Sequence, residues 1–127
     1  MESEILADTS VLINLQRGEK EAIKTFRKNV YGIGISRITT YEFIYGSRNK
    51  REKEINKNFL NKLNIVELDE EISELAYELL DRYCLKVKLD IPDALIAATA
   101  ISYNMKLWTE NTKHFKLVKE LKLFQKI

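Results

Sequence analysis

The clearest pattern along the chain is a run of apolar residues at helical spacing that begins just after residue 70. Its members are Ile72, Leu75, Ala76, Leu79, Leu80 and Tyr83. Residues three and four apart share one face of a helix, so this run predicts an amphipathic helix with that face in a core. The same spacing at Ile55, Phe59, Leu60 and Leu63 predicts a second helix over residues 50–63.

Short apolar runs between the helical segments predict strands. The expected strands cover residues 4–7, 31–35, 65–68 and 106–109, with a last short one near residues 121–125. The other expected helices cover residues 9–16, residues 19–29, the segment through Glu42 to about Gly46, and the segment from Pro92 to about Tyr103. Strands that alternate with helices are typical of an α/β fold with a mostly parallel sheet.

Length and composition indicate one ordinary globular domain over residues 1–127, with 45% hydrophobic and 31% charged residues. The N-terminal segment Met1-Glu2-Ser3-Glu4 is acidic, and every apolar run is far shorter than the roughly 20 residues of a membrane helix. We therefore expect neither a secretory signal nor a membrane association. Cys84 is the only cysteine, so no intrachain disulfide can form, which fits a reducing cytoplasm.

Three acids stand at the ends of apolar segments. Asp8 follows a short apolar run, Glu42 lies inside a mostly apolar segment, and Asp93 precedes an alanine-rich one. A charge beside a buried element costs free energy unless something compensates for it. If the three carboxylates converge, Mg²⁺ or Mn²⁺ is the natural compensator, and such a nest of acids is typical of phosphate chemistry.

Each of these acids also has a local structural explanation. Asp8 is placed to cap a helix, Thr39 and Glu42 match the S/T-x-x-E capping box, and Asp93 falls in a first helical turn that favours an anion. Taken together, however, the three acids all fall where strands end or helices begin. These ends meet at one edge of a parallel sheet, where ligands bind, so we expect one shared pocket.

Two further groups of residues bear on this pocket. Asn111 follows a predicted strand, and it either ligates a cation through its amide oxygen or caps a turn. Asp90, just before Pro92, is interpreted as a solvated loop acid. A basic run is expected to guide a phosphate backbone, although a solvated helix face has the same pattern. Its first members are Arg48, Lys50, Arg51 and Lys53.

Other chemistries are poorly supported by the residues present. His114 is the only histidine, which excludes zinc sites built on two or three histidines. The chain has no Gly-rich phosphate-binding loop and no nucleophile elbow for a Ser-His-Asp triad. The acidic pocket is therefore the main candidate for a catalytic site.

Four segments of the chain resemble the PIN-domain family, and within it the VapC-type toxin ribonucleases. The segments are residues 6–13 (LADTSVLI), 40–46 (TYEFIYG), 91–100 (IPDALIAATA) and 107–115 (LWTENTKHF). They occur in the family's order and span nearly the whole chain. The resemblance implies a three-layer α/β/α sandwich with a central parallel sheet, and an endoribonuclease that requires Mg²⁺ or Mn²⁺ to hydrolyse RNA phosphodiester bonds.

The resemblance also implies roles for particular residues. Asp8, Glu42 and Asp93 match the family's three constant acids, as metal ligands and catalytic groups, and Thr9 and Thr109 would line the pocket. Asn111 stands where the family often has Asp, and His114 stands where it often has an acid before Phe115. As a toxin of a type II toxin–antitoxin pair, the chain would form a homodimer and bind a small antitoxin.

Two other functions remain open at this point. A PIN fold with a weakened metal site would serve as a non-catalytic RNA- or protein-binding module, and neutral Asn111 is the residue that raises this alternative. A phosphoacceptor receiver domain also has an acidic Mg²⁺ pocket, but it needs adjacent acids after the first strand. Here Asp8 is followed by Thr9.

Overall fold

The fold is built on four parallel strands that lie in the order β3-β2-β1-β4. A computed structural model describes residues 4–125 of the chain, and the single domain over residues 1–127 stays a prediction. The elements are β1 (Ile5–Ala7), α1 (Thr9–Gln16), α2 (Lys20–Lys28), η1 (Val30–Gly32), β2 (Ile33–Ser36), α3 (Arg37–Tyr45), α4 (Lys50–Leu60), β3 (Asn64–Val66), α5 (Glu70–Val87), α6 (Ile91–Ser102), β4 (Lys106–Trp108) and α7 (Thr112–Phe115).

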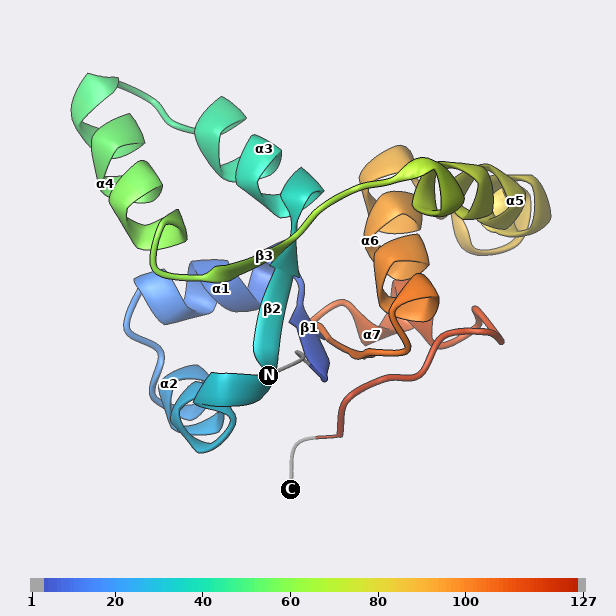
Figure 1. The fold of residues 1–127 in the computed structure, drawn as a ribbon, viewed down its shortest axis with the longest axis horizontal. Helices are drawn as coiled ribbons and strands as arrows, with labels where there is room; N and C mark the ends of the chain where they lie inside the picture. Colours follow the sequence, from blue (N-terminus) through green and yellow to red (C-terminus); the bar gives the residue numbers. More distant parts are fainter. Residues whose placement is uncertain (1–3, 126–127) are drawn as a thin grey trace.

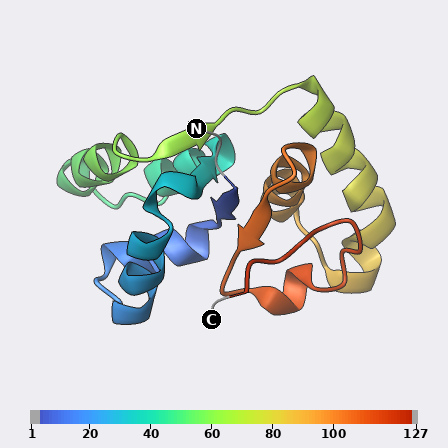
Figure 2. The same ribbon diagram turned by 60° about the horizontal axis from the view of Figure 1, so that its bottom comes forward.

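Helices cover both faces of the sheet, so the chain has the predicted three-layer α/β/α arrangement. In Figures 1 and 2, α1 to α4 lie on one side of the strands, and α5 and α6 lie on the other. Side chains alternate along a strand, and in β1 Ile5 and Ala7 face one core while Leu6 faces the second. Residues on both faces are buried, as expected for a parallel sheet between helical layers.

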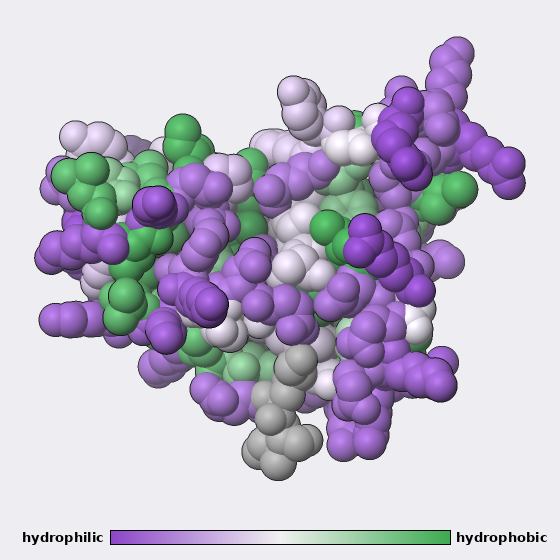
Figure 3. Space-filling view, turned by 180° about the vertical axis from the view of Figure 1, so that it is seen from behind, coloured by the Kyte–Doolittle hydropathy of each residue, from purple (hydrophilic) through white to green (hydrophobic). Residues whose placement is uncertain are grey.

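The α5–α6 pair forms most of one outer layer. The predicted amphipathic helix is confirmed, because Ile72, Ala76, Leu79 and Tyr83 are buried on one face of α5. The Asp69 side chain accepts a hydrogen bond from the Ile72 amide at 2.8 Å and so caps the start of α5. Figure 3 shows the molecule from behind, where the surface is mainly hydrophilic and hydrophobic side chains appear in separate places.

Several predicted boundaries differ from the structure. The strand expected over residues 31–35 begins only at Ile33, because residues 30–32 form a 3₁₀ turn. The last expected strand, near residues 121–125, is reduced to an isolated bridge between Leu123 and Leu107. Ile55 was expected on the buried face of α4 but is 51% exposed, and the neighbouring Asn56 is buried in its place.

None of the helices formed by residues 4–125 is both long enough and apolar enough to cross a bilayer.

Candidate active site

Asp8 lies at the carboxyl end of β1, at the centre of the sheet edge. It is 4% exposed, and its own amide donates to the Trp108 carbonyl at 2.9 Å. Its Oδ1 accepts from the Thr9 amide at 2.7 Å, which makes Asp8 the N-cap of α1. The cap predicted from the sequence is therefore present, and it holds the carboxylate in one orientation.

The other oxygen of Asp8 binds two hydroxyl groups. Thr109 Oγ1 donates to Asp8 Oδ2 at 2.7 Å, and Ser10 Oγ donates to the same oxygen at 3.1 Å. Both hydroxyls also accept from the chain after β4, since the Asn111 amide donates to Thr109 Oγ1 at 2.9 Å and the Glu110 amide to Ser10 Oγ at 3.1 Å. This network ties the ends of β1 and β4 around the Asp8 carboxylate.

Glu42 reaches the same edge from the middle of α3. Its Oε1 accepts a hydrogen bond from Thr9 Oγ1 at 2.6 Å. Burial raises the pKa of Glu42 above its ordinary value, the Thr9 hydrogen bond lowers it, and the charges of Asp8 and Asp90 raise it further. The predicted capping box is wrong, because α3 begins at Arg37 and its N-cap is Ser36, whose Oγ accepts from the Ile38 amide.

Asp93 completes the edge from the first turn of α6. Its side chain is 16% exposed, and His114 Nδ1 lies 3.5 Å from its Oδ2. Burial raises the pKa of Asp93 to about 6, and the charges of Asp90 and Asp8 add to this effect, while the contact with His114 opposes it. Asp8 thus acts by charge on both Glu42 and Asp93, so the predicted acids share one region.

Asp90 belongs to this region as well, although it is exposed before α6 as the sequence predicts. Its Oδ1 accepts from the Asp93 amide at 2.9 Å and caps α6. Its charge also raises the pKa of both Glu42 and Asp93. We call the carboxylates of Asp8, Glu42, Asp90 and Asp93 the acidic rim.

The acidic rim has almost no compensation from basic side chains. Within residues 4–125, only His114 lies within ion-pair distance of any of the four carboxylates. Within the same part of the chain, no three His, Cys, Asp or Glu side chains lie close enough together to form a complete metal-binding site. The donor chemistry nevertheless suits a hard divalent cation, because the rim supplies carboxylate and hydroxyl oxygens and retains excess negative charge.

The remaining predicted site residues lie around the acidic rim. The Asn111 amide is bonded to Thr109, but its side chain is exposed and makes no capping bond to α7. Arg48 is exposed, pairs with Glu52, and lines a groove that Glu42 also lines. Lys50, Arg51 and Lys53 project from α4 into solvent and do not line that groove.

Sequence reasoning missed three contributors: Ser10, Asp90 and His114. Ser10 lies within the segment that resembles the family, and Asp90 has the three-residue spacing of a helix cap before Asp93. Both signals were available in the sequence. The contact between His114 and Asp93 had no such signal, because it depends on how the chain after β4 folds back onto α6.

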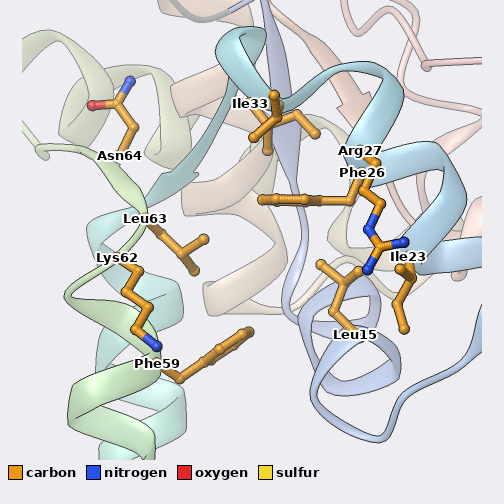
Figure 4. A pocket seen from close by; sticks show the side chains of 10 residues that line it. Leu15, Ile23, Phe26, Arg27, Ile33, Phe59, Lys62, Leu63 and Asn64 are labelled. Carbon is orange, nitrogen blue, oxygen red and sulfur yellow. The ribbon is translucent and has the colours of Figure 1, made fainter.

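A second hollow, of about 530 Å³, lies on the other side of α1. Figure 4 shows Leu15, Phe26, Ile33, Phe59 and Leu63 pointing toward one another from α1, α2, β2, the end of α4 and the turn after it. Arg27 and Lys62 stand at its margin. We call it the apolar groove.

Comparisons with known proteins consistently find similarity to one family. The sequence model described as "PIN domain" matches residues 5–121 of the chain. The chain is 39% identical to a protein named "Ribonuclease VapC1" from Methanocaldococcus jannaschii, over 98% of this chain and 90% of that protein.

Solved structures with a similar fold include toxin–antitoxin complexes. The fold is similar to a toxin–antitoxin complex from Klebsiella pneumoniae, with a TM-score of 0.78 and 31% identity over 97% of this chain and 99% of that one. It is also similar to VapBC2 from Rickettsia felis bound to a DNA fragment from its promoter. That match has a TM-score of 0.79 and 25% identity over the whole of both chains.

Proposed function

Because this chain belongs to the PIN-domain family, we propose that it is a divalent-cation-dependent endoribonuclease and the toxin of a type II toxin–antitoxin pair. The observation that supports this proposal most is the convergence of Asp8, Glu42 and Asp93 on one sheet edge without a Lys or Arg counter-ion among the described residues. Uncompensated carboxylates gathered at the carboxyl edge of a parallel sheet suit a phosphate-binding cation.

Asp8, Glu42 and Asp93 would hold Mg²⁺ or Mn²⁺, and Asn111 would contribute through its amide oxygen. When bound, the cation would supply Lewis acidity toward a phosphoryl oxygen and neutralise the charge of the rim. Thr109 and Ser10 fix the Asp8 carboxylate by their hydrogen bonds, so its orientation does not depend on the ligand. Thr9 holds Glu42 in the same way.

The chain's own residues would position the reaction and move its proton. Glu42, held at the rim by the Thr9 hydrogen bond, would accept a proton from the water that attacks the phosphodiester in line with the leaving oxygen. Exposed basic residues on the α3–α4 side would guide the RNA backbone toward the rim. They are Arg48, Lys50, Arg51 and Lys53.

The apolar groove is the surface that we propose for the antitoxin. Most of its lining residues are aliphatic or aromatic, which suits the apolar face of an amphipathic helix. Arg27 and Lys62 at its margin favour acidic residues on the flanks of that helix. A homodimer and a cytoplasmic location, where cellular RNA is found, are parts of this proposal that follow from the family alone. A small overlapping gene upstream would support the toxin assignment.

The proposed activity is tested by RNA cleavage with Mg²⁺ or Mn²⁺, with and without EDTA. We expect EDTA to abolish cleavage, and Asp8→Asn and Asp93→Asn each to lower it by more than about 100-fold, because each removes a charged ligand. Asp81→Asn makes the same chemical change at an exposed position on α5 and should leave cleavage unchanged. Full activity in either rim variant contradicts the assignment.

A non-catalytic binding module on the same fold is the second candidate. Two observations favour this binding module: residues 4–125 contain no complete metal-binding site, and the Asn111 side chain is exposed. Calorimetric titration with Mn²⁺ separates the two functions. Heat of binding that disappears in Asp93→Asn supports the nuclease, whereas no binding at millimolar Mn²⁺ favours the binding module.

A further inference from the structure

A groove of about 510 Å³ opens directly beside the acidic rim, between α1 and the α3–α4 hairpin. Figure 1 shows these three helices on the same side of the sheet. The groove is lined by Thr9, Ile13, Gln16, Arg17, Glu42, Phe43, Gly46, Arg48, Glu52, Ile55 and Asn56. Since Thr9 and Glu42 belong both to this groove and to the proposed active site, a ligand in the groove is continuous with one at the acidic rim.

One wall of the groove is a single face of α1. Thr9, Ile13 and Arg17 recur every four residues and all line the groove. With a rise of about 1.5 Å per residue, Arg17 lies about 12 Å along the helix axis from Thr9. The groove therefore runs from the acidic rim at one end to a guanidinium group at the other.

The middle of the groove is apolar on both walls. Ile13 on α1 is 37% exposed, and Ile55 on α4 is 51% exposed. Exposed isoleucines facing one hollow from two helices present flat apolar surface that the fold itself does not cover. Enzymes that bind nucleotides commonly hold a planar base between apolar side chains of this kind.

A buried amide network fixes one polar group beside this apolar section. Asn56 is 6% exposed, and its Oδ1 accepts from Gln16 Nε2 at 2.7 Å. Its Nδ2 donates to Ser47 Oγ at 2.9 Å and to the Phe43 carbonyl at 3.3 Å. All hydrogen-bonding groups of the Asn56 side chain therefore have partners, and Asn56 fixes the orientation of the exposed Gln16 amide. A side-chain amide in a fixed orientation can form specific hydrogen bonds with the edge of a base.

Two arginines line the groove. Arg17 is exposed, and within residues 4–125 no carboxylate lies within ion-pair distance of it. The Arg48 side chain is 85% exposed, and it pairs with Glu52 at 3.1 Å. A nucleotide chain carries a phosphate at every step, so the same RNA would meet the acidic rim through one phosphate and these guanidinium groups through another.

We propose that this groove is a base-reading subsite for the nucleotide next to the scissile phosphate, with the base between Ile13 and Ile55, its edge on Gln16, and its phosphate on Arg17 and Arg48. The inference rests on the proposed ribonuclease function. An acidic peptide segment of a partner would also satisfy the two arginines, but it would meet the negative charge of Glu42 at the other end of the groove.

The test is the binding of short fluorescein-labelled single-stranded RNAs of adenosine, cytidine or uridine, in EDTA, followed by fluorescence anisotropy. Arg17→Ala should weaken all the RNAs by about fivefold and lower the slope of log K against log salt by about 1, since one phosphate contact is lost. Gln16→Ala should weaken only the preferred RNA, by about fivefold or more, without a change in salt slope. Lys86→Ala on α5 is the charge control, because it lies on the opposite layer, and it should bind as the wild type does.

Other outcomes overturn the proposal and separate it from the function on which it rests. If the wild type cleaves RNA but both groove variants keep its affinities and its base preference, the subsite is refuted and the ribonuclease stands. If the variants bind RNA normally but no longer co-purify with the antitoxin, the groove belongs to the partner. If the wild type neither binds nor cleaves RNA, the function itself fails. Because Arg17 is exposed, Arg17→Ala should fold normally. It therefore still tests the subsite if Gln16→Ala proves to be unfolded.

Discussion

The α5–α6 pair and the acidic rim use the same parallel sheet in opposite ways. In the helix pair, apolar side chains such as Leu79 and Ile96 are buried and belong to one hydrophobic cluster. In the acidic rim, carboxylates with raised pKa values lie together beside one exposed histidine. The first region stabilises the fold, whereas the second retains a charge excess that the fold itself does not neutralise. This difference shows where the molecule is built to receive a ligand.

The largest expected effect is on the stability of the helix pair. Leu79→Ala removes a fully buried side chain from α5 and should lower the free energy of unfolding by about 2–5 kcal/mol, measured by urea denaturation. Leu85→Ala on the same helix is the matched control, because Leu85 is 95% exposed, and it should change stability by less than about 0.5 kcal/mol. Similar losses for the two variants would contradict the assignment of α5 to the core.

The next effect is expected on activity at the rim. Thr109→Val keeps the shape of a buried side chain but removes its donor to Asp8 Oδ2. We expect RNA cleavage to fall by about 10–100-fold, as for other side chains that orient a metal ligand. Thr112→Val, at an exposed position in α7, serves as the control. An unchanged cleavage rate in Thr109→Val would show that the hydroxyl does not position Asp8.

The smallest of the three effects is the dependence of stability on pH in EDTA. A carboxyl whose pKa is raised in the folded state favours folding only while it is protonated, and this contribution is lost as pH rises through the folded-state value. For Asp93 the loss should occur between about pH 4 and pH 6 and amount to about 1 kcal/mol, after allowance for its partial exposure.

Asp93→Asn should remove this loss, so the comparison is between the stability curves of the two proteins across that pH range. Added Mn²⁺ at neutral pH should stabilise the wild type more than Asp93→Asn, because only the wild type keeps the full set of proposed ligands. Parallel stability curves for the two proteins would mean that ionisation of Asp93 does not destabilise the folded state.

The two regions also differ in how far the sequence predicts them. The repeat of apolar residues in α5 and the Pro92 turn of α6 are local, so their helices were placed correctly. The sheet edge was predicted by topology, since parallel strands bring their carboxyl ends together wherever they occur in the chain. The sequence therefore predicts that Asp8, Glu42 and Asp93 lie in one region.

What the sequence could not supply depends on contacts between distant segments. Glu42 matches a local capping pattern in the sequence. Only the hydrogen bond from Thr9 shows that the Glu42 side chain points to the rim. The Tyr31-Gly32 pair continues an alternating pattern, yet the chain turns there before it enters β2. Ile55 fits the spacing of a buried face, but the Asn56 network takes the inner position on α4.

The single tryptophan gives the molecule a built-in optical probe. Trp108 is 1% exposed, it packs against Phe124 with ring centroids 5.8 Å apart, and its indole nitrogen has no hydrogen-bond partner among residues 4–125. Its backbone carbonyl also accepts from the amide of Asp8. Emission from this indole therefore comes from a buried environment one peptide bond away from Thr109, and a shift in its emission maximum would report loosening of the sheet without any added label.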